Sequence, residues 1–424
     1  MKKKLTSTEF IERHRVRPSD FTRERSLPFH KVFLLLINFL TKSLQAELDN
    51  LFRVILNKEI PVNAVSKTAF CLARKKLGYE AFVELDKDQI DGFYQIGSYN
   101  CWNGFRLIGV DGSTARLPIS KEIQSEYGIH DTSETGTAIT YARLSQAYDL
   151  LNNLTLDAIL STYNDNEHNL ALRHTAIFKL GDLVVCDRNY ASFWMFALLK
   201  SKNVDFCFRI KVGSWKTARY LVDSREQEIT AEIYPSKQST KKCIELGISK
   251  APMRLRFICI TLNTGEMEVL VTSLTNPEKY PHSAFSQLYQ FRWQVEESYK
   301  TMKSRLEMEN FSGKSCLSVQ QDFHAKIFSC NLTAILVSGT DGLVEKKCAK
   351  RKKTYKINFT QALNRMKNSI VLLFYREKET AGIYLDELVL LFAANLEPVR
   401  KERCFQRNFR ESKRIYPMPY KNAF

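Results

Sequence analysis

The order of strand-like and helical runs between residues 103 and 212 restricts the fold more than any other feature of the chain. Three apolar strand-like runs come first, at 105–110, 138–149 and 154–162. Two more, at 183–186 and 205–212, alternate with helical stretches at 167–178 and 191–200. Three strands followed by alternating helix and strand are typical of a mixed sheet in the α/β class.

The segments on either side of this sheet have other periodicities. Before about residue 100 the chain is predicted to be mostly helical, because Phe33, Ile37, Leu40, Leu44, Leu48 and Leu51 recur at steps of three and four. A second, basic helix is predicted over 68–77, with Ser66 as its N-cap. The stretch 213–280 shows no helical period and is predicted to be a β-rich insertion. Residues 283–306 include neither Gly nor Pro, which favours one long helix.

The charge balance points to a polyanionic partner. Sixty-three Lys and Arg against 46 Asp and Glu give a net charge of +17. Residues 345–424 alone carry 19 Lys and Arg against 8 Asp and Glu. Such an excess is typical of proteins that bind nucleic acid or, as a distant alternative, an anionic membrane surface. The apolar run 32–40 is about half the length that spans a bilayer, so no membrane segment is expected.

Cysteine and histidine positions argue against a zinc site or a disulfide framework. The ten cysteines include no C-x-x-C pair and form no cluster with histidine. Reduced thiols in a cytoplasmic protein are therefore expected. His168 and His174 lie six residues apart on a predicted helix and are expected at its surface.

Two aspartates each follow an apolar strand. Asp111 ends the run LIGVD and precedes Gly112, and Asp187 ends the run LVVCD. Aspartate is common as a turn residue at a strand end, so neither position alone indicates catalysis. Two such strands in one mixed sheet would bring both carboxylates to one sheet edge, where ligands tend to bind.

A four-residue pattern on the predicted helix 283–306 is more specific. Tyr289, Arg292, Glu296 and Lys303 fall within an arc of about 60° when each residue advances by about 100°. Glu297 points to another face, so Glu296 is the carboxylate aligned with the cations. Spacing alone leaves open a solvated face held by ion pairs.

These four residues resemble the Tyr-x2-Arg-x3-Glu-x6-Lys signature of the DDE transposases of bacterial insertion sequences, in the insertion sequence four family. The surroundings are similar as well: VDGS at 110–113, CDRNY at 186–190, QFRWQVEE at 290–297 and FSGK at 311–314. The similarity extends over nearly the whole chain, from Phe29 to the basic tail. All three acids and all four signature residues are present.

The resemblance implies an RNase H-like catalytic core in which the first and fourth strands are neighbours. Asp111 and Asp187 would then lie together, with Glu296 reaching in from the long helix. The implied regions are a helical N-terminal DNA-binding region at 1–100, the core at 101–212 and 281–340, a β-rich insertion at 213–280, and a basic helical C-terminal region at 341–424 for DNA contact and dimerisation.

The resemblance also implies the activity, which is metal-dependent cleavage at transposon ends and strand transfer into target DNA. The expected route is cut-and-paste transposition with a hairpin intermediate. Asp111, Asp187 and Glu296 would be both the catalytic residues and the metal ligands. Two Mg²⁺ ions, for which Mn²⁺ can substitute, would be held with Asp111 bridging them. The three other residues of the signature would contact DNA phosphates.

Further DNA contacts are predicted from basic and aromatic residues. Arg74, Lys75 and Lys76 on the second helix are candidates for contacts to the DNA ends, although plain solvated charge explains them equally well. Trp215 is the candidate for stacking on an extruded base, whereas Trp293 is expected to support the signature helix.

The expected partners are double-stranded DNA, namely the terminal inverted repeats of the transposon and target DNA, and a second copy of the chain. A homodimer on DNA is expected because two ends are joined in one event. Its interface is expected at 384–396, although these apolar residues can equally pack on their own core. The expected location is the bacterial cytoplasm, at the nucleoid. A transposase-derived DNA-binding protein without catalysis, and a metal-dependent nuclease without strand transfer, remain alternatives.

Overall fold

The chain forms two compact units in the computed structural model, which describes residues 1–23, 25–132, 138–261 and 266–399. The first unit comprises residues 1–97, 114–142 and the chain from residue 300 onward. The second comprises residues 98–113 and 143–299.

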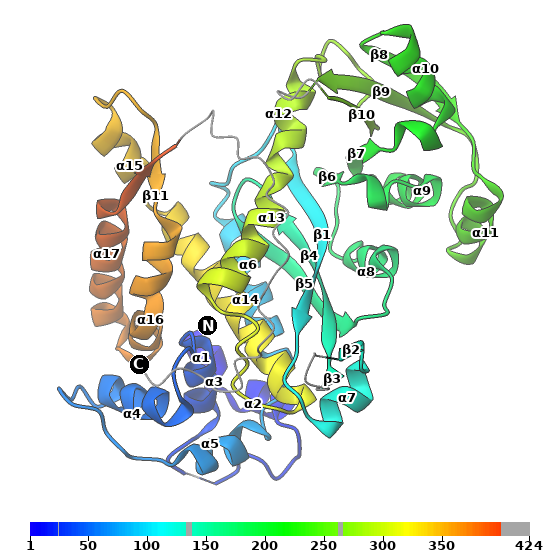
Figure 1. Cartoon of the computed structure of the whole chain (residues 1–424). Helices are drawn as coiled ribbons and strands as arrows, with labels where there is room; N and C mark the ends of the chain where they lie inside the picture. Colours follow the sequence, from blue (N-terminus) through cyan, green and yellow to red (C-terminus); the bar gives the residue numbers. More distant parts are fainter. Residues whose placement is uncertain (24, 133–137, 262–265, 400–424) are drawn as a thin grey trace. The chain divides into compact units, whose positions relative to one another are not determined.

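An eight-stranded sheet is the framework of the second unit (Figure 1), with the order β5-β4-β1-β6-β7-β10-β9-β8. The strands β1, β6 and β7 are parallel neighbours, and β7, β10, β9 and β8 pair antiparallel. The first long strand thus lies between the second and the fourth, which is the RNase H-like order and confirms the predicted fold class. The strands are β1 (Arg106–Arg116), β4 (Tyr141–Asp149), β5 (Leu154–Thr162), β6 (Asp182–Cys186), β7 (Asp205–Ile210), β8 (Glu228–Ile233), β9 (Met253–Thr261) and β10 (Met267–Thr272).

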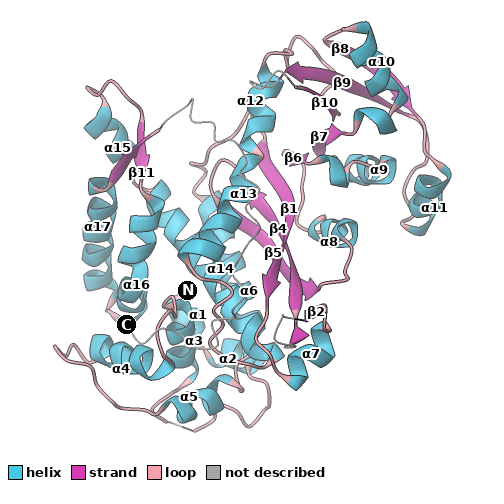
Figure 2. Ribbon diagram, viewed as in Figure 1, coloured by secondary structure: helices cyan, strands magenta, loops and turns pink. Residues whose placement is uncertain are grey.

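The predicted β-rich insertion contains two helices that the sequence pattern did not reveal. Its strands β8, β9 and β10 continue the core sheet beyond β7; α10 (Lys216–Ser224) lies against β8 and β9, whereas α11 (Lys237–Glu245) packs against α9 (Phe193–Ser201) (Figure 2). Each helix has nine residues and buries only two of them. Such a short buried face leaves almost no apolar period, so the sequence pattern showed the strands of this β-rich stretch but not its two helices.

The predicted long helix 283–306 is interrupted twice. It consists of α12 (Ala284–Phe291), α13 (Trp293–Lys300) and the π-helical segment η3 (Thr301–Arg305). Because π-helical bonds join residues five apart, the angular step used in the sequence analysis no longer applies to Lys303. The other helical segments of the second unit are α8 (Glu167–His174), η1 (Arg188–Tyr190), α9 (Phe193–Ser201) and η2 (Val212–Ser214).

The first unit is largely helical and is organised around α14 (Cys316–Ser338), which packs against α3, α6 and α16. Among the described residues, no single helix has the length and apolarity to cross a bilayer; only the bent pair of α14 and α15 has them together, and most of α14 is buried. The unit contains α1 (Lys2–Leu5), α2 (Thr8–His14), α3 (Phe29–Ile37), α4 (Leu44–Ile55), α5 (Lys67–Arg74), α6 (Glu80–Gln95), α7 (Lys121–Tyr127), α15 (Asp341–Cys348), α16 (Phe359–Tyr375), α17 (Lys378–Ala394) and the short strands β2 (Asp131–Thr132), β3 (Ala138–Ile139), β11 (Tyr355–Ile357) and β12 (Leu396–Pro398).

The helical spacing predicted from Phe33 to Leu51 belongs to two helices, α3 and α4. The chain turns between them at Phe39, whose φ is +52°. The buried carboxylate of Glu47 accepts hydrogen bonds from the amides of Thr41 and Lys42, at 3.0 and 2.9 Å. Because Glu47 satisfies these two amides, the chain can turn here without continuing the helix. The apolar residues therefore keep a helical spacing although they belong to two separate helices.

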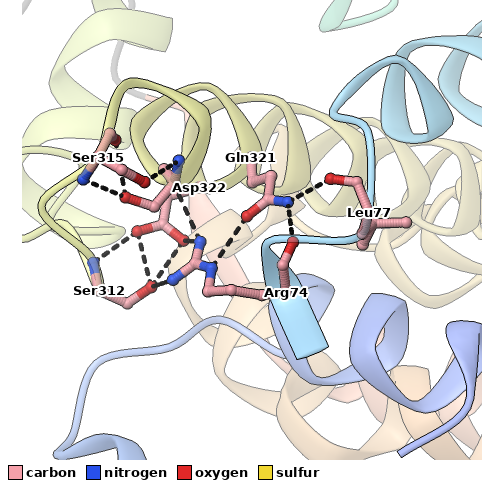
Figure 3. A network of polar contacts seen from close by, with 7 residues as sticks. Arg74, Leu77, Ser312, Ser315, Gln321 and Asp322 are labelled. Carbon is pink, nitrogen blue, oxygen red and sulfur yellow. Dashed lines mark hydrogen bonds and ion pairs between the residues drawn. The ribbon is translucent and has the colours of Figure 1, made fainter. Parts of the chain in front are cut away.

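The second predicted helix is observed as α5, and Ser66 is its N-cap, accepting a hydrogen bond from the amide of Ala69 at 3.2 Å. Arg74 at its end, however, is buried and is not available as a DNA contact (Figure 3). Its guanidinium donates to Gln321, Ser312 and Asp322 at 2.9, 2.8 and 3.0 Å. Lys75 is exposed, and Lys76 lies 4.0 Å from Asp20.

The Arg74 network explains the FSGK stretch at 311–314. Ser312 accepts from Arg74 and donates to Asp322 at 2.7 Å. A Cβ on Gly313 would lie 2.5 Å from the Ser318 hydroxyl, so a side chain there would displace this corner. Gln321 donates to the carbonyls of Arg74 and Leu77, which fixes the end of α5 on α14.

Replacing Arg74 should therefore destabilise the protein. Arg74→Ala leaves the carboxylate of Asp322 buried without its cation, which costs about 3–5 kcal/mol of unfolding free energy. The matched control, Lys75→Ala, removes an exposed cation and should change stability by less than about 0.5 kcal/mol. Urea unfolding followed by circular dichroism measures both. Equal effects of the two substitutions would contradict the buried network.

Candidate active site

Asp111 and Asp187 directly follow the last paired residues of two neighbouring parallel strands, although β1 itself continues to Arg116, so Asp111 lies within a strand and not at the strand end that the sequence predicted. The register of β1 and β6 pairs Val110 with Cys186, so each aspartate is the next residue along its strand. At the opposite end of the pair, Arg106 on β1 donates two hydrogen bonds to Asp182 on β6, both 2.8 Å long. This buried ion pair fixes the register that brings the two aspartates together.

The helices α12 and α13, which carry Tyr289 and Glu296 and meet at Arg292, lie beside the sheet of this unit (Figure 1). Tyr299 donates to the main-chain carbonyl of Asp111 at 2.8 Å, and Tyr289 donates to the carboxylate of Asp187 at 3.4 Å. On β4, Gln146 donates to Ser298. Side chains of α12 and α13 are therefore tied to three strands, which positions Glu296 near both aspartates.

The carboxylates of Glu296 and Asp187 both lie within electrostatic range of Asp111. Burial raises the pKa of Asp111 to about 6, and the charges of Glu296 and Asp187 add to this increase, while the amide of Gly112 and the guanidinium of Arg292 oppose it. Burial also acts to raise the pKa of Asp187, but the Arg188 amide together with Arg209 and Arg292 outweighs it and lowers the pKa overall. One aspartate is thus held ionised while its neighbour is poised to take a proton.

Two arginines balance this negative charge. Arg292 is buried and donates to Glu296 at 2.8 Å, with its guanidinium 4.9 Å from the ring of Trp293. Its Nε is buried and has no hydrogen-bond partner among the residues described. Arg209 on β7 lies 2.7 Å from Asp187 and also pairs with Glu268. Both acids other than Asp111 therefore have a guanidinium counter-ion.

The donor set suits a hard divalent cation. All three side chains offer carboxylate oxygens, the ligands that such a cation prefers. Glu296 and Asp187 both raise the pKa of Asp111, as expected for carboxylates that lie near one another without a bound cation. Within the described parts of the chain, no three His, Cys, Asp or Glu side chains stand close enough to hold a metal in this conformation. Glu296 is turned to Arg292 and Asp187 to Arg209, so the residues fit a cation once these ion pairs open.

The remaining predicted residues differ in where they lie. Lys303 belongs to the first unit, where burial lowers the pKa of its ammonium, and its DNA contact stays a prediction. Trp215 packs against Phe196 and Phe257, with ring centroids 5.8 and 6.4 Å away. Its stacking role also stays a prediction. Trp293, expected only to support the helix, is 42% exposed beside Arg292 and presents more open aromatic surface.

A buried hydrogen-bonded chain of Ser145, His174 and Asp157 was not anticipated. His174 was expected at the surface but is fully buried, 2.9 Å from the Ser145 hydroxyl and 2.7 Å from the Asp157 carboxylate. The order serine–histidine–aspartate is that of a nucleophilic triad. Ser145 is only 2% exposed, however, so no substrate reaches it. These three hydrogen-bonded side chains instead have a structural role, because they connect β4, β5 and α8.

The raised pKa of Asp111 predicts a pH-dependent cost to stability in the metal-free protein. The folded state holds a proton up to about pH 6, and the unfolded state only to about 3.8, so stability falls as the pH rises through this window. Asp111→Asn should be more stable than wild type above about pH 6, by up to about 3 kcal/mol, and equal to it below about pH 4. Thermal unfolding in EDTA across this range measures the difference. A difference that does not change with pH would contradict the assignment.

Comparison with known proteins gives one family. Residues 102–332 match the family model described as the transposase DDE domain. The chain is 21% identical over 380 residues to the transposase InsG for insertion sequence element IS4 of Escherichia coli (strain K12), covering 85% of this chain and 80% of that relative. It is 30% identical over 97 residues to the putative transposase y4zB of Sinorhizobium fredii (strain NBRC 101917 / NGR234), covering 23% of this chain and 26% of that one.

Among solved structures, a cryo-EM structure of the piggyBac transposase synaptic complex with hairpin DNA matches with a TM-score of 0.45 and 11% identity, covering 91% of this chain and 84% of that chain. The family model spans more than half of the sequence and includes Asp111, Asp187 and Glu296. The signature and the domain match agree, and the chain belongs to the DDE transposases, of the insertion sequence four type.

Proposed function

We propose that this transposase cuts a DNA transposon at its ends and joins it to target DNA in a metal-dependent reaction. The observation that carries the proposal is the meeting of Asp111, Asp187 and Glu296 at one end of the β1–β6 pair, each beside a group that controls its charge. Divalent metal use is general for the DDE transposase domain. Terminal inverted repeats and target DNA are the substrates that we propose.

Asp111, Asp187 and Glu296 are the residues that would hold two Mg²⁺ ions, or Mn²⁺ in their place. When bound, such cations activate the attacking oxygen and offset charge on the leaving oxygen. The side chain of Asp187 is already ionised by Arg209, and Tyr299 fixes the backbone at Asp111. Asp187 therefore already carries the charge that a ligand needs, and it would turn from Arg209 to the cation when the ion pair opens.

Arg292 would change partners during the reaction. In the free protein its guanidinium neutralises Glu296, and its Nε has an unused donor. When Glu296 turns to a cation, the freed guanidinium can form charge-assisted hydrogen bonds to a DNA phosphate. Tyr289 is 3.4 Å from Asp187 and can donate to the same strand. Lys303 would supply a further cation to the backbone.

The proposed reaction alternates hydrolysis and transesterification at phosphorus. Water attacks at the transposon end, a new P–O bond forms, and the bond to the 3′ oxygen breaks to leave a 3′-OH. This hydroxyl attacks the opposite strand, which releases the flanking DNA and closes a hairpin on the transposon end. A second water reopens the hairpin, and the regenerated 3′-OH then attacks a target phosphodiester.

The alternatives predict different outcomes. A DNA-binding protein without catalysis would not need three acids, and all three are present. A nuclease without strand transfer would cleave the ends but would not join them to a second DNA. A strand-transfer assay on target plasmid separates this alternative from transposition.

We further propose that DNA contacts extend to a basic groove in the first unit. The groove is lined by Arg23, Arg25 and Lys76 together with the start of α5 at Ser66. Lys75 is exposed on the same helix. These cations are suited to the phosphate backbone, whereas the basic residues 400–424 lie outside the described part of the chain.

We propose that two copies pair on DNA through α17, in the bacterial cytoplasm where the nucleoid lies. The segment 384–396 packs inward through Leu388 and Phe392, yet leaves Leu390 59% exposed, and Ile383 one heptad earlier is 63% exposed. This exposed face is available to a second copy. Native mass measurement with end DNA, comparing wild type with Leu390→Glu, tests the pairing.

Removing any one of the three acids should abolish cleavage and leave DNA binding intact. Asp111→Ala, Asp187→Ala and Glu296→Ala should each lower the cleavage rate at least about a thousandfold, because the cation loses a ligand while phosphate contacts remain. The matched control is Glu297→Ala, an exposed carboxylate one residue from Glu296. Cleavage of end DNA and its binding by mobility shift are measured together. If Glu297 proved essential and Glu296 dispensable, the assignment of the helix face would be wrong.

End binding should weaken steeply as salt rises, because phosphate contacts release counterions. Replacing both Lys75 and Lys76 with Ala should lower the slope of log affinity against log salt by about 2. Lys87→Ala is the control, since Lys87 is exposed on α6, away from the basic groove. Fluorescence anisotropy at several salt concentrations gives the slope. A slope unchanged by the double substitution would move the contact surface elsewhere.

A further inference from the structure

An acid outside the signature is bonded to the arginine that holds Asp187. Arg209 on β7 donates through Nε to the Asp187 carboxylate at 2.8 Å, and its Nη2 lies 2.7 Å from the same oxygen. The remaining nitrogen of the guanidinium, Nη1, donates to the carboxylate of Glu268 on β10. One guanidinium therefore links Asp187 to a second carboxylate.

The strand registers explain why these three side chains meet. The parallel register of β6 and β7, extended by one step, makes Asp187 and Arg209 neighbours on one face of the sheet. The antiparallel register of β7 and β10 places Leu270 opposite Arg209, so Glu268 lies two residues along β10 on the same face. Such diagonal neighbours are within reach of long side chains. The contacts thus follow from the order β6-β7-β10 in the sheet.

The charges of the three side chains do not balance. Asp187 and Glu268 share the single positive charge of Arg209, so one negative charge is left over. The side chain of Glu268 is only 14% exposed, and a carboxylate with so little contact with water is costly unless it is paired. Arg209 is therefore the counter-ion of Glu268 as well as of the catalytic aspartate.

Arg292 differs from Arg209 in this respect. Among the residues that the structure describes, it is hydrogen-bonded to one carboxylate only, that of Glu296. Arg292 would thus lose its carboxylate partner when Glu296 turns to a cation. Arg209 would still be paired with Glu268 after Asp187 has turned away.

We propose that Glu268 is a positioning residue of the catalytic centre, which acts through Arg209 and keeps this guanidinium in place when Asp187 turns to a divalent cation. This inference rests on the proposed function. Without Glu268, opening the ion pair of Arg209 with Asp187 would leave a half-buried guanidinium without a counter-ion, which opposes cation binding. Glu268 lowers that cost and so increases the cation affinity without being a ligand. An ion pair that only joins β7 to β10 would leave the affinity unchanged.

The same sheet contains a matched ion pair that serves as the control. Arg256 on β9 donates to the carboxylate of Glu228 on β8. The register places Thr230 opposite Arg256, so Glu228 is its diagonal neighbour, as Glu268 is the diagonal neighbour of Arg209. Neither member of this control pair is bonded to a catalytic acid within the described ranges.

The test is Mn²⁺ binding to the full chain without DNA, measured by calorimetry and by the electron paramagnetic resonance signal of free Mn²⁺. Glu268→Gln should weaken binding about tenfold, because Arg209 then has only Asp187 as its carboxylate partner. Glu228→Gln also removes a cross-strand ion pair, but its affinity for Mn²⁺ should stay within about twofold of wild type.

A double-substitution cycle shows whether Glu268 acts through Arg209. Arg209→Gln alone should strengthen Mn²⁺ binding, because it removes a cation that competes for Asp187. In the Arg209→Gln background, Glu268→Gln should change the affinity by less than about threefold, since only the direct effect of its charge remains.

Unchanged Mn²⁺ affinity in Glu268→Gln would overturn the inference, as would equal weakening by Glu228→Gln or a full tenfold loss in the Arg209→Gln background. If Glu268→Gln fails to fold, a crystal structure of wild type with Mn²⁺ decides, because Arg209 separated from Glu268 would contradict the proposed role. The proposed function fails separately. It falls if wild type does not cleave end DNA, or if Asp111→Asn binds Mn²⁺ as wild type does, whatever Glu268 contributes.

Discussion

The parallel pairing of β1 with β6 is the constraint on which the active site depends. The pairing is fixed at one end by the buried Arg106–Asp182 ion pair, and Asp111 and Asp187 directly follow its last paired residues at the other end. Gly109 is required within it, because a Cβ there would lie 2.7 Å from the side chain of Leu150. A slip of one residue would send one aspartate to the opposite face of the sheet.

Charge balance is the second principle of the site. Glu296 and Asp187 are held in ion pairs with Arg292 and Arg209, whereas the Asp111 carboxylate has no arginine bonded to it within the described ranges and has a raised pKa. Concentrated negative charge would otherwise destabilise the metal-free fold. The arginines lower that cost, and in the proposed function they would become available for phosphate when a cation replaces them.

Much of the second unit could be predicted from the sequence, because its strands are apolar runs of clear length. The strand 154–162 is observed as β5 with the same bounds. Local patterns singled out Asp111, Asp187 and Glu296, but only the family resemblance gave them a catalytic role, which stays a prediction. The predictions that were wrong concern side chains whose burial depends on contacts with residues distant in the sequence. Arg74 looks like a surface cation until Gln321 and Asp322 are placed beside it, and His174 looks exposed until Ser145 and Asp157 enclose it. The short helices α10 and α11 bury too few residues to show a period.

The central claim is that Asp111, Asp187 and Glu296 form one cation site once their arginine pairs open. A crystal structure of the protein with end DNA and Mn²⁺, with anomalous scattering recorded at the manganese edge, tests it most directly. We expect manganese bound by the Asp111 carboxylate, with Asp187 and Glu296 also as ligands and Glu296 turned away from Arg292. Manganese bound elsewhere, with Glu296 still paired to Arg292 at saturating concentration, would contradict the account.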